Sequence, residues 1–114
     1  MSWILKVKSK FQAAHFLENY KGKCERVHGH TFHVEAEIKV TELDRAGIGI
    51  DFTGIKKKLD EILPDHTHLN EVYDFPPSAE NISRHLFDQL KEFFPITKLT
   101  VWESEDASAT YSED

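Results

Sequence analysis

Residues 31–41 read TFHVEAEIKVT, and apolar and polar side chains alternate along them. A strand turns successive side chains to opposite faces, so a period of two indicates a strand with one buried face. The apolar face would carry Phe32, Val34, Ala36, Ile38 and Val40, and the polar face His33, Glu35, Glu37 and Lys39. We therefore predict a strand from about His30 to Thr41.

The first residues of the chain show the same alternation. Among the odd-numbered positions, apolar side chains stand at Trp3, Leu5, Val7, Phe11 and Ala13. The alternation continues to His15, and it predicts a first strand from about Trp3 to Phe16. In the same way, His28 and His30 extend the apolar face of the second strand backwards. If the two strands pair, three imidazole rings meet at one end of the core face.

Three histidines at one end of a core face match the ligand set of a catalytic zinc site, which keeps a fourth position open. Structural zinc sites are usually closed by four ligands and are rich in Cys, whereas this chain has a single Cys. A lone inward histidine is more often a hydrogen-bonded core residue, and that alternative applies to each ring taken by itself. The three together predict that His15, His28 and His30 bind Zn²⁺, which would act as a Lewis acid on a substrate hydroxyl.

Two amphipathic helices are predicted between residues 51 and 95. Asp51 and Ser78 are the expected N-caps, and Pro64 and Pro95 would end the helices. The buried stripes would hold Ile55, Leu59, Ile62 and Leu63 in the first helix, and Ile82, Leu86, Leu90 and Phe93 or Phe94 in the second. A polar loop from Asp65 to Pro77 would join them.

Two further strands are predicted after the helices, from Lys98 to Glu103 and from about Ala109 to Ser112. This order of elements favours an α+β fold, in which two helices are inserted between the second and third strands of a four-stranded antiparallel sheet and pack on one face. A sheet of this size exposes its edge strands, which subunit association would cover.

The chain has 114 residues, of which 39% are hydrophobic and 30% are charged, so we expect one domain spanning residues 1–114. Its formal net charge of −6 disfavours nonspecific binding to nucleic acid, which depends on clustered basic side chains. No apolar run approaches the ~20 residues of a membrane span, and the N-terminus becomes charged at Lys6, too early for a signal peptide. We expect a cytoplasmic protein that binds neither nucleic acid nor membranes.

Several titratable side chains could assist a metal centre. Cys24 lies four residues before His28, close enough for its thiolate to act as a general base, although an uninvolved loop thiol is the alternative. The adjacent Glu25 offers a carboxylate as a second acid or base. Asp65 could orient the ring of His66 in a proton relay, or could only cap a turn.

Glu103 shares a face with Leu99 and Val101, and an inward carboxylate is costly unless it is paired. A ligand with adjacent N–H donors, such as the edge of a pterin or guanine ring, would pair it. An internal Lys or Arg is the alternative partner.

Taken together, these patterns resemble the 6-pyruvoyl-tetrahydropterin synthase family, which includes the 6-carboxytetrahydropterin synthases of queuosine biosynthesis. The resemblance covers nearly the whole chain and rests on the order of six motifs: FQAAH at 11–15, CERVHGH at 24–30, IDF at 50–52, DHTHLN at 65–70, PSAEN at 77–81 and VWE at 101–103. It implies the family fold, a T-fold that oligomerises into barrels. It also implies a homo-oligomer, a hexamer formed as a dimer of trimers, with active sites at subunit interfaces.

The resemblance implies a role for each candidate residue. The zinc ligands would be His15, His28 and His30, the general base Cys24, and the proton relay Asp65 with His66. The pterin ring would be anchored by Glu103, with Glu80 and Ser78 near it.

Three residues between Cys24 and the HGH motif resemble the carboxy-forming enzymes, because pyruvoyl-forming members have a longer insertion there. The resemblance thus favours conversion of 7,8-dihydroneopterin triphosphate to 6-carboxy-5,6,7,8-tetrahydropterin, with loss of acetaldehyde and triphosphate. Glu25 resembles relatives that form 6-hydroxymethyl-7,8-dihydropterin for folate synthesis, so a dual activity is an alternative, as is 6-pyruvoyl-tetrahydropterin synthesis. A noncatalytic zinc- or purine-binding module would need the histidines but not Cys24, and a hydrolase using zinc-bound water would need no thiol.

Overall fold

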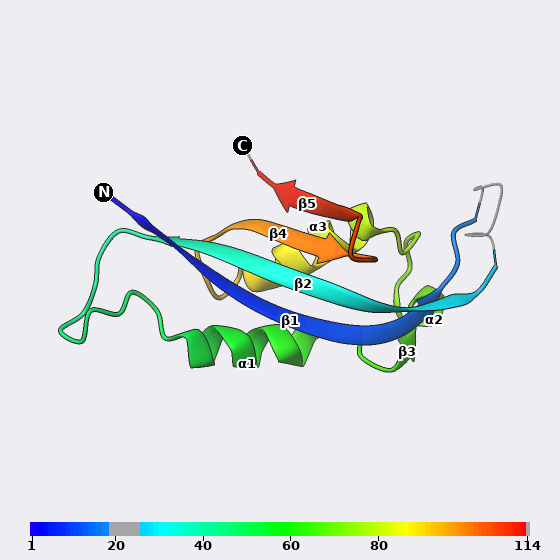
Figure 1. Ribbon diagram of the computed structural model, residues 1–114, viewed down its shortest axis with the longest axis horizontal. Helices are drawn as coiled ribbons and strands as arrows, with labels where there is room; N and C mark the ends of the chain where they lie inside the picture. Colours follow the sequence, from blue (N-terminus) through cyan, green and yellow to red (C-terminus); the bar gives the residue numbers. More distant parts are fainter. Residues whose placement is uncertain (19–25, 114) are drawn as a thin grey trace.

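The computed structural model describes residues 1–18 and 26–113. Its longest feature is a ribbon of two antiparallel strands, β1 (Trp3–His15) and β2 (His28–Val40), drawn in blue and cyan in Figure 1. The register pairs Trp3 with Val40 at one end and His15 with His28 at the other. Both predicted strands are confirmed, and β2 begins two residues earlier than expected, so that His28 belongs to it.

Within the residues that the structure describes, the sheet has five strands, in the order β3-β1-β2-β4-β5. As predicted, β4 (Ile96–Trp102) and β5 (Ser108–Ser112) extend it in antiparallel fashion. The short strand β3 (Thr67–His68) instead pairs parallel to β1, along Ala13 and Ala14. The prediction of a four-stranded, wholly antiparallel sheet was therefore wrong. Strand β3 lies within the predicted polar loop, and its two residues are too few to show a strand period.

Three helices occur in the described residues: α1 (Phe52–Ile62), α2 (Leu69–Val72) and α3 (Ala79–Leu90). The predicted caps are confirmed, because Asp51 and Ser78 accept hydrogen bonds from N–H groups in the first turns of α1 and α3, at 2.8 and 3.2 Å. Helix α2 was not predicted, since four residues make a single turn and carry no amphipathic pattern. Within residues 1–18 and 26–113, none of the helices has the length and apolar character needed to cross a membrane.

Helices α1 and α3 cover one face of the sheet, with α1 against β1 and α3 against β4 and β5 (Figure 1). The apolar face of each strand lies toward these helices. The fully buried side chains include Phe11, Phe32, Val34, Leu99, Ile55, Leu59, Ile82, Leu86 and Leu90. Of the remaining predicted stripe residues, Ile62, Leu63 and Phe94 are only partly buried, and Phe93 is exposed. His15 is 0% exposed and lies at the end of this core.

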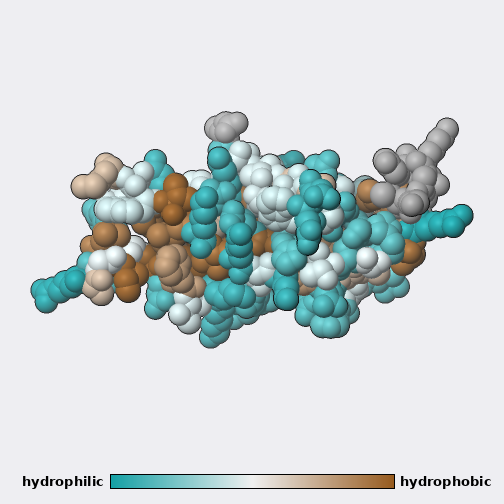
Figure 2. Space-filling model, viewed as in Figure 1, coloured by the Kyte–Doolittle hydropathy of each residue, from teal (hydrophilic) through white to brown (hydrophobic). Residues whose placement is uncertain are grey.

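A hydrophobic patch lies at the end of the molecule where β1 begins. Trp3, Leu43, Ile48 and Phe52 line a common pocket there and are between 38% and 57% exposed. Figure 2 shows brown hydrophobic surface at this end, whereas hydrophilic side chains dominate much of the remaining surface in the same view.

Candidate metal centre and active site

The pairing of β1 with β2 brings three histidine rings together where β1 ends and β2 begins. This end of the ribbon lies beside β3 and α2 (Figure 1). His15 pairs with His28, and His30 lies opposite Ala13 on the same face. The three ring centroids are 4.5–5.1 Å apart, and one ligand nitrogen of each ring lies within 4.8 Å of the others. This cluster could hold one metal ion.

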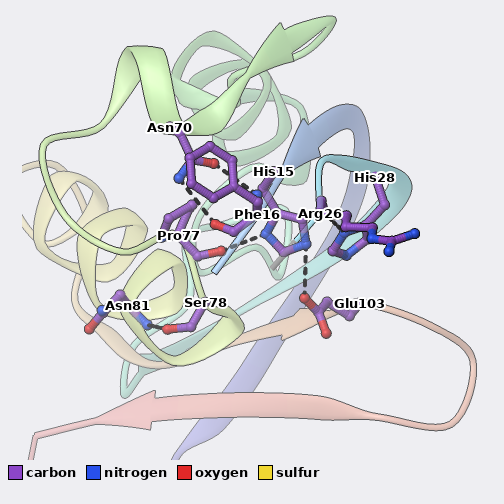
Figure 3. Close-up of polar contacts among 9 residues, drawn as sticks. All are labelled: His15, Phe16, Arg26, His28, Asn70, Pro77, Ser78, Asn81 and Glu103. Carbon is purple, nitrogen blue, oxygen red and sulfur yellow. Dashed lines mark hydrogen bonds and ion pairs between the residues drawn. The ribbon is translucent and has the colours of Figure 1, made fainter. Parts of the chain in front are cut away.

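Backbone carbonyls fix the orientation of two of the rings (Figure 3). Nδ1 of His15 lies 2.8 Å from the carbonyl oxygen of Pro77, and Nδ1 of His28 lies 2.7 Å from that of Arg26. A carbonyl oxygen can only accept, so each Nδ1 donates its proton. Each Nε2 is then left with a lone pair, the arrangement in which histidines bind metals.

Two of the free nitrogens are buried. Among the described residues, Nε2 of His15 and Nε2 of His30 have no well-aligned hydrogen-bond partner. Burial, followed by the charge of the neighbouring His28, lowers the pKa of His30 below its usual 6.5 and so favours the neutral ring. Buried imidazole nitrogens without a hydrogen-bond partner suit a divalent cation, which would take up their lone pairs.

Glu103 follows β4 and reaches the same cluster, as its predicted inward direction requires. Its Oε1 lies 3.2 Å from Nε2 of His15, and its side chain is 31% exposed (Figure 3). A carboxylate that faces an imidazole lone pair is repelled, and a proton or a metal ion on Nε2 removes the repulsion. When Nε2 carries a proton, its hydrogen bond lowers the pKa of Glu103 below the usual 4.5. The predicted alternative of an internal Lys or Arg partner is not found among the described residues.

Asp65 and His66 form a separate pair on the surface. Oδ2 of Asp65 lies 2.9 Å from Nδ1 of His66, and the two side chains are 50% and 78% exposed. The second oxygen of Asp65 accepts a hydrogen bond from Gln12 N, which is the main reason why the pKa of Asp65 is lowered. His66 adopts a φ of 56°, an uncommon conformation for a residue other than glycine. No hydrogen bond or ion pair within residues 1–18 and 26–113 joins this pair to the three histidines.

The other predicted site residues are not brought into the histidine cluster by any described contact. Ser78 uses its hydroxyl to cap α3, and Glu80 lies exposed in the first turn of that helix. Cys24 and Glu25 lie outside the described residues.

Sequence reasoning gave no functional role to two residues that lie against the site. Pro77 contributes only its carbonyl group, which every residue has, so no side-chain pattern could reveal the contact with His15. Asn70 binds the backbone of Phe16, the residue after His15. The position of Asn70 within the DHTHLN motif was the available signal.

Comparison with known proteins identifies the family of this chain and supports its fold. The family model for 6-pyruvoyl tetrahydropterin synthase matches residues 4–114, and the chain belongs to that family. The curated relatives include the 6-carboxy-5,6,7,8-tetrahydropterin synthase of Synechocystis, which is 34% identical over 79% of this chain and 76% of its own length. An Archaeoglobus fulgidus protein provisionally given the same name is 38% identical over 90% of each chain. The family resemblance and its pterin chemistry are thereby confirmed.

A solved structure supports the fold. The 6-pyruvoyl tetrahydropterin synthase of Caenorhabditis elegans superimposes with a TM-score of 0.87 at 24% identity, covering 100% of this chain and 97% of that chain. The α+β architecture expected from the family is therefore confirmed.

Proposed function

We propose that the protein is a zinc-dependent lyase that converts 7,8-dihydroneopterin triphosphate to 6-carboxy-5,6,7,8-tetrahydropterin, acetaldehyde and triphosphate, a step of queuosine biosynthesis. The observation that carries this proposal is the 34% identity to a curated enzyme of that name over most of both chains. The three-residue spacing between Cys24 and the HGH motif favours the same product.

The proposed zinc ligands are the Nε2 atoms of His15 and His28 and a ring nitrogen of His30. Hydrogen bonds from Nδ1 to backbone carbonyls leave Nε2 available in the first two rings, and burial lowers the pKa of His30, which favours its neutral form. When bound, Zn²⁺ would polarise the side-chain oxygens of the substrate.

The remaining groups have separate proposed tasks. Glu103, partly exposed beside the histidines, would accept hydrogen bonds from the N–H groups of the pterin edge. Cys24 would act as the general base. The Asp65 carboxylate accepts the Nδ1 proton of His66, which leaves Nε2 of that ring to take or release a proton.

We also propose a homo-oligomer, a hexamer with active sites at subunit interfaces. The Asp65–His66 pair is exposed and makes no described contact with the histidines of its own chain, so it is available to a neighbouring subunit's site. The apolar patch around Trp3 and Phe52 offers a second surface for association.

Product analysis tests the proposed reaction. Purified protein is incubated with 7,8-dihydroneopterin triphosphate, and the pterin products are identified by mass spectrometry. We expect 6-carboxytetrahydropterin from the wild type and none from His28→Ala. The matched control is His33→Ala, because His33 lies on the same strand but on the helix-free face and is exposed. Wild-type protein that binds zinc but forms no pterin product would instead indicate a binding module.

Glu25 favours a second candidate activity, the formation of 6-hydroxymethyl-7,8-dihydropterin, either alone or beside the carboxy product. A carboxylate next to the proposed base could remove a proton from a different side-chain position of the same substrate. Glu25→Ala should then abolish the hydroxymethyl product and spare the carboxy product. An unchanged product ratio in this variant, or no hydroxymethyl product from the wild type, would leave Glu25 without this role.

A further inference from the structure

One segment, residues 65–77, holds the end of β1 that carries His15. The N–H of Gln12 donates to the Asp65 side chain at 2.8 Å, and its carbonyl accepts from the His66 N–H at 2.6 Å. Strand β3 pairs with the next two residues of β1. The last residues of β1 are therefore bound to this segment along the edge of the strand that faces away from β2.

The strand ladders end at His15, and Phe16 is the first residue beyond them. The side-chain amide of Asn70 binds both backbone groups of Phe16 (Figure 3). Its Oδ1 accepts from Phe16 N at 2.9 Å, and its Nδ2 donates to Phe16 O at 3.0 Å. One planar amide thus replaces the paired residue that a longer neighbouring strand would supply.

We propose that Asn70 is a positioning residue for the metal centre, acting through the backbone of Phe16 to fix the direction of the His15 ring. The inference rests on the proposed metal-binding function. The His15 ring is held at Nδ1 by the carbonyl of Pro77, which belongs to the same segment as Asn70. A shift of Phe16 would turn the ring away from Pro77 and move Nε2 relative to His28 and His30.

The chemistry of the contact explains why an asparagine is needed. An amide presents an acceptor and a donor in one plane, which matches the N–H and C=O of a single residue. In Asn70→Asp the side chain keeps its size but sets a carboxylate oxygen against the carbonyl of Phe16. In Asn70→Ala both hydrogen bonds are lost and no charge is added. The aspartate variant loses the bond to the Phe16 carbonyl and the alanine variant loses both bonds, so a shared effect identifies the contact itself.

The test measures Co²⁺ binding to the metal-free full chain by chelator competition and by visible absorption, at a temperature well below unfolding. Groups that orient metal ligands typically change affinity 10–100-fold. We expect both Asn70 variants to bind Co²⁺ about 10–100-fold more weakly, with an altered absorption spectrum. The control Glu71→Gln changes the exposed neighbour of Asn70 in α2 and should match the wild type.

A folded Asn70 variant that binds Co²⁺ with wild-type affinity and spectrum overturns the positioning role, even if its thermal stability is reduced. Circular dichroism decides which variants are folded, and Asn70→Ala serves if the aspartate variant is not. Wild-type protein that binds no Co²⁺ overturns the proposed metal centre and this inference together. Wild-type binding and product formation, with unchanged affinity in the variants, overturn this inference alone.

Discussion

His15→Ala and His28→Ala should both abolish metal binding but should differ in their effect on the metal-free fold. Each variant leaves two of three proposed ligands. His15 is 0% exposed and donates to the carbonyl of Pro77, 62 residues away, whereas His28 is partly exposed and bonds to Arg26, two residues away. The comparison therefore separates the loss of a ligand from the loss of a core contact.

The magnitude follows from what each ring touches. Loss of the His15 ring leaves the buried carbonyl of Pro77 without its donor, at a cost of about 1–3 kcal/mol. The edge-on contact with Phe32, at a centroid distance of 5.3 Å, is lost as well, and the cavity adds about 1–2 kcal/mol. Removal of an unpaired Nε2 partly offsets this, so we expect a loss of about 2–4 kcal/mol for His15→Ala and below about 1 kcal/mol for His28→Ala.

Thermal unfolding in the presence of a chelator measures the difference. At roughly 4 °C per kcal/mol for a chain of this size, His15→Ala should lower Tm by about 8–16 °C and His28→Ala by less than about 4 °C. Elemental analysis without chelator should find little zinc in either variant, and His33→Ala should retain both zinc and Tm. Equal losses of Tm in the two variants would refute the argument from burial, and full zinc occupancy in either would refute the three-ligand site.

Three other perturbations address the remaining groups. Cys24→Ala should retain zinc and Tm but slow carboxytetrahydropterin formation about 10²–10⁴-fold, as loss of a general base does, and a wild-type rate in the mass-spectrometric assay would exclude the thiol as base. Glu103→Gln should mainly raise the Kd of a pterin ligand in calorimetry, with a smaller effect on zinc content, because an acceptor-only carboxylate becomes an amide. An unchanged Kd counts against the anchor role. Burial lowers the pKa of His30 in the folded chain below 6.5, so the unfolded chain binds more protons, and the free energy of unfolding of the metal-free protein should fall as pH drops below about 6.5. Urea titrations should show a weaker dependence in His30→Gln; identical profiles between about pH 7 and about pH 5 would contradict this cause.

The elements that could be predicted are those whose signal is local. The strand period of two places the core residues of β1 and β2 on one face, and side-chain caps at Asp51 and Ser78 set the starts of α1 and α3. Strand β3 and helix α2 were missed because each is too short to complete a period. Their conformation depends on pairing with β1 and on packing beside it, which are contacts with residues more than fifty positions earlier.

The histidine cluster was predictable from the sequence alone, because its members continue the apolar faces of two strands, and these strands must pair to bury those faces. The family and its pterin chemistry were likewise readable from the order and spacing of the motifs. Only the tertiary structure decided how the rings are oriented. The carbonyl of Pro77, the amide of Asn70 and the carboxylate of Glu103 reach the end of β1 from elsewhere in the chain. Every residue has a backbone carbonyl group, so a residue pattern does not show which of these groups forms a hydrogen bond to a given side chain. The packing of the whole fold determines the partners.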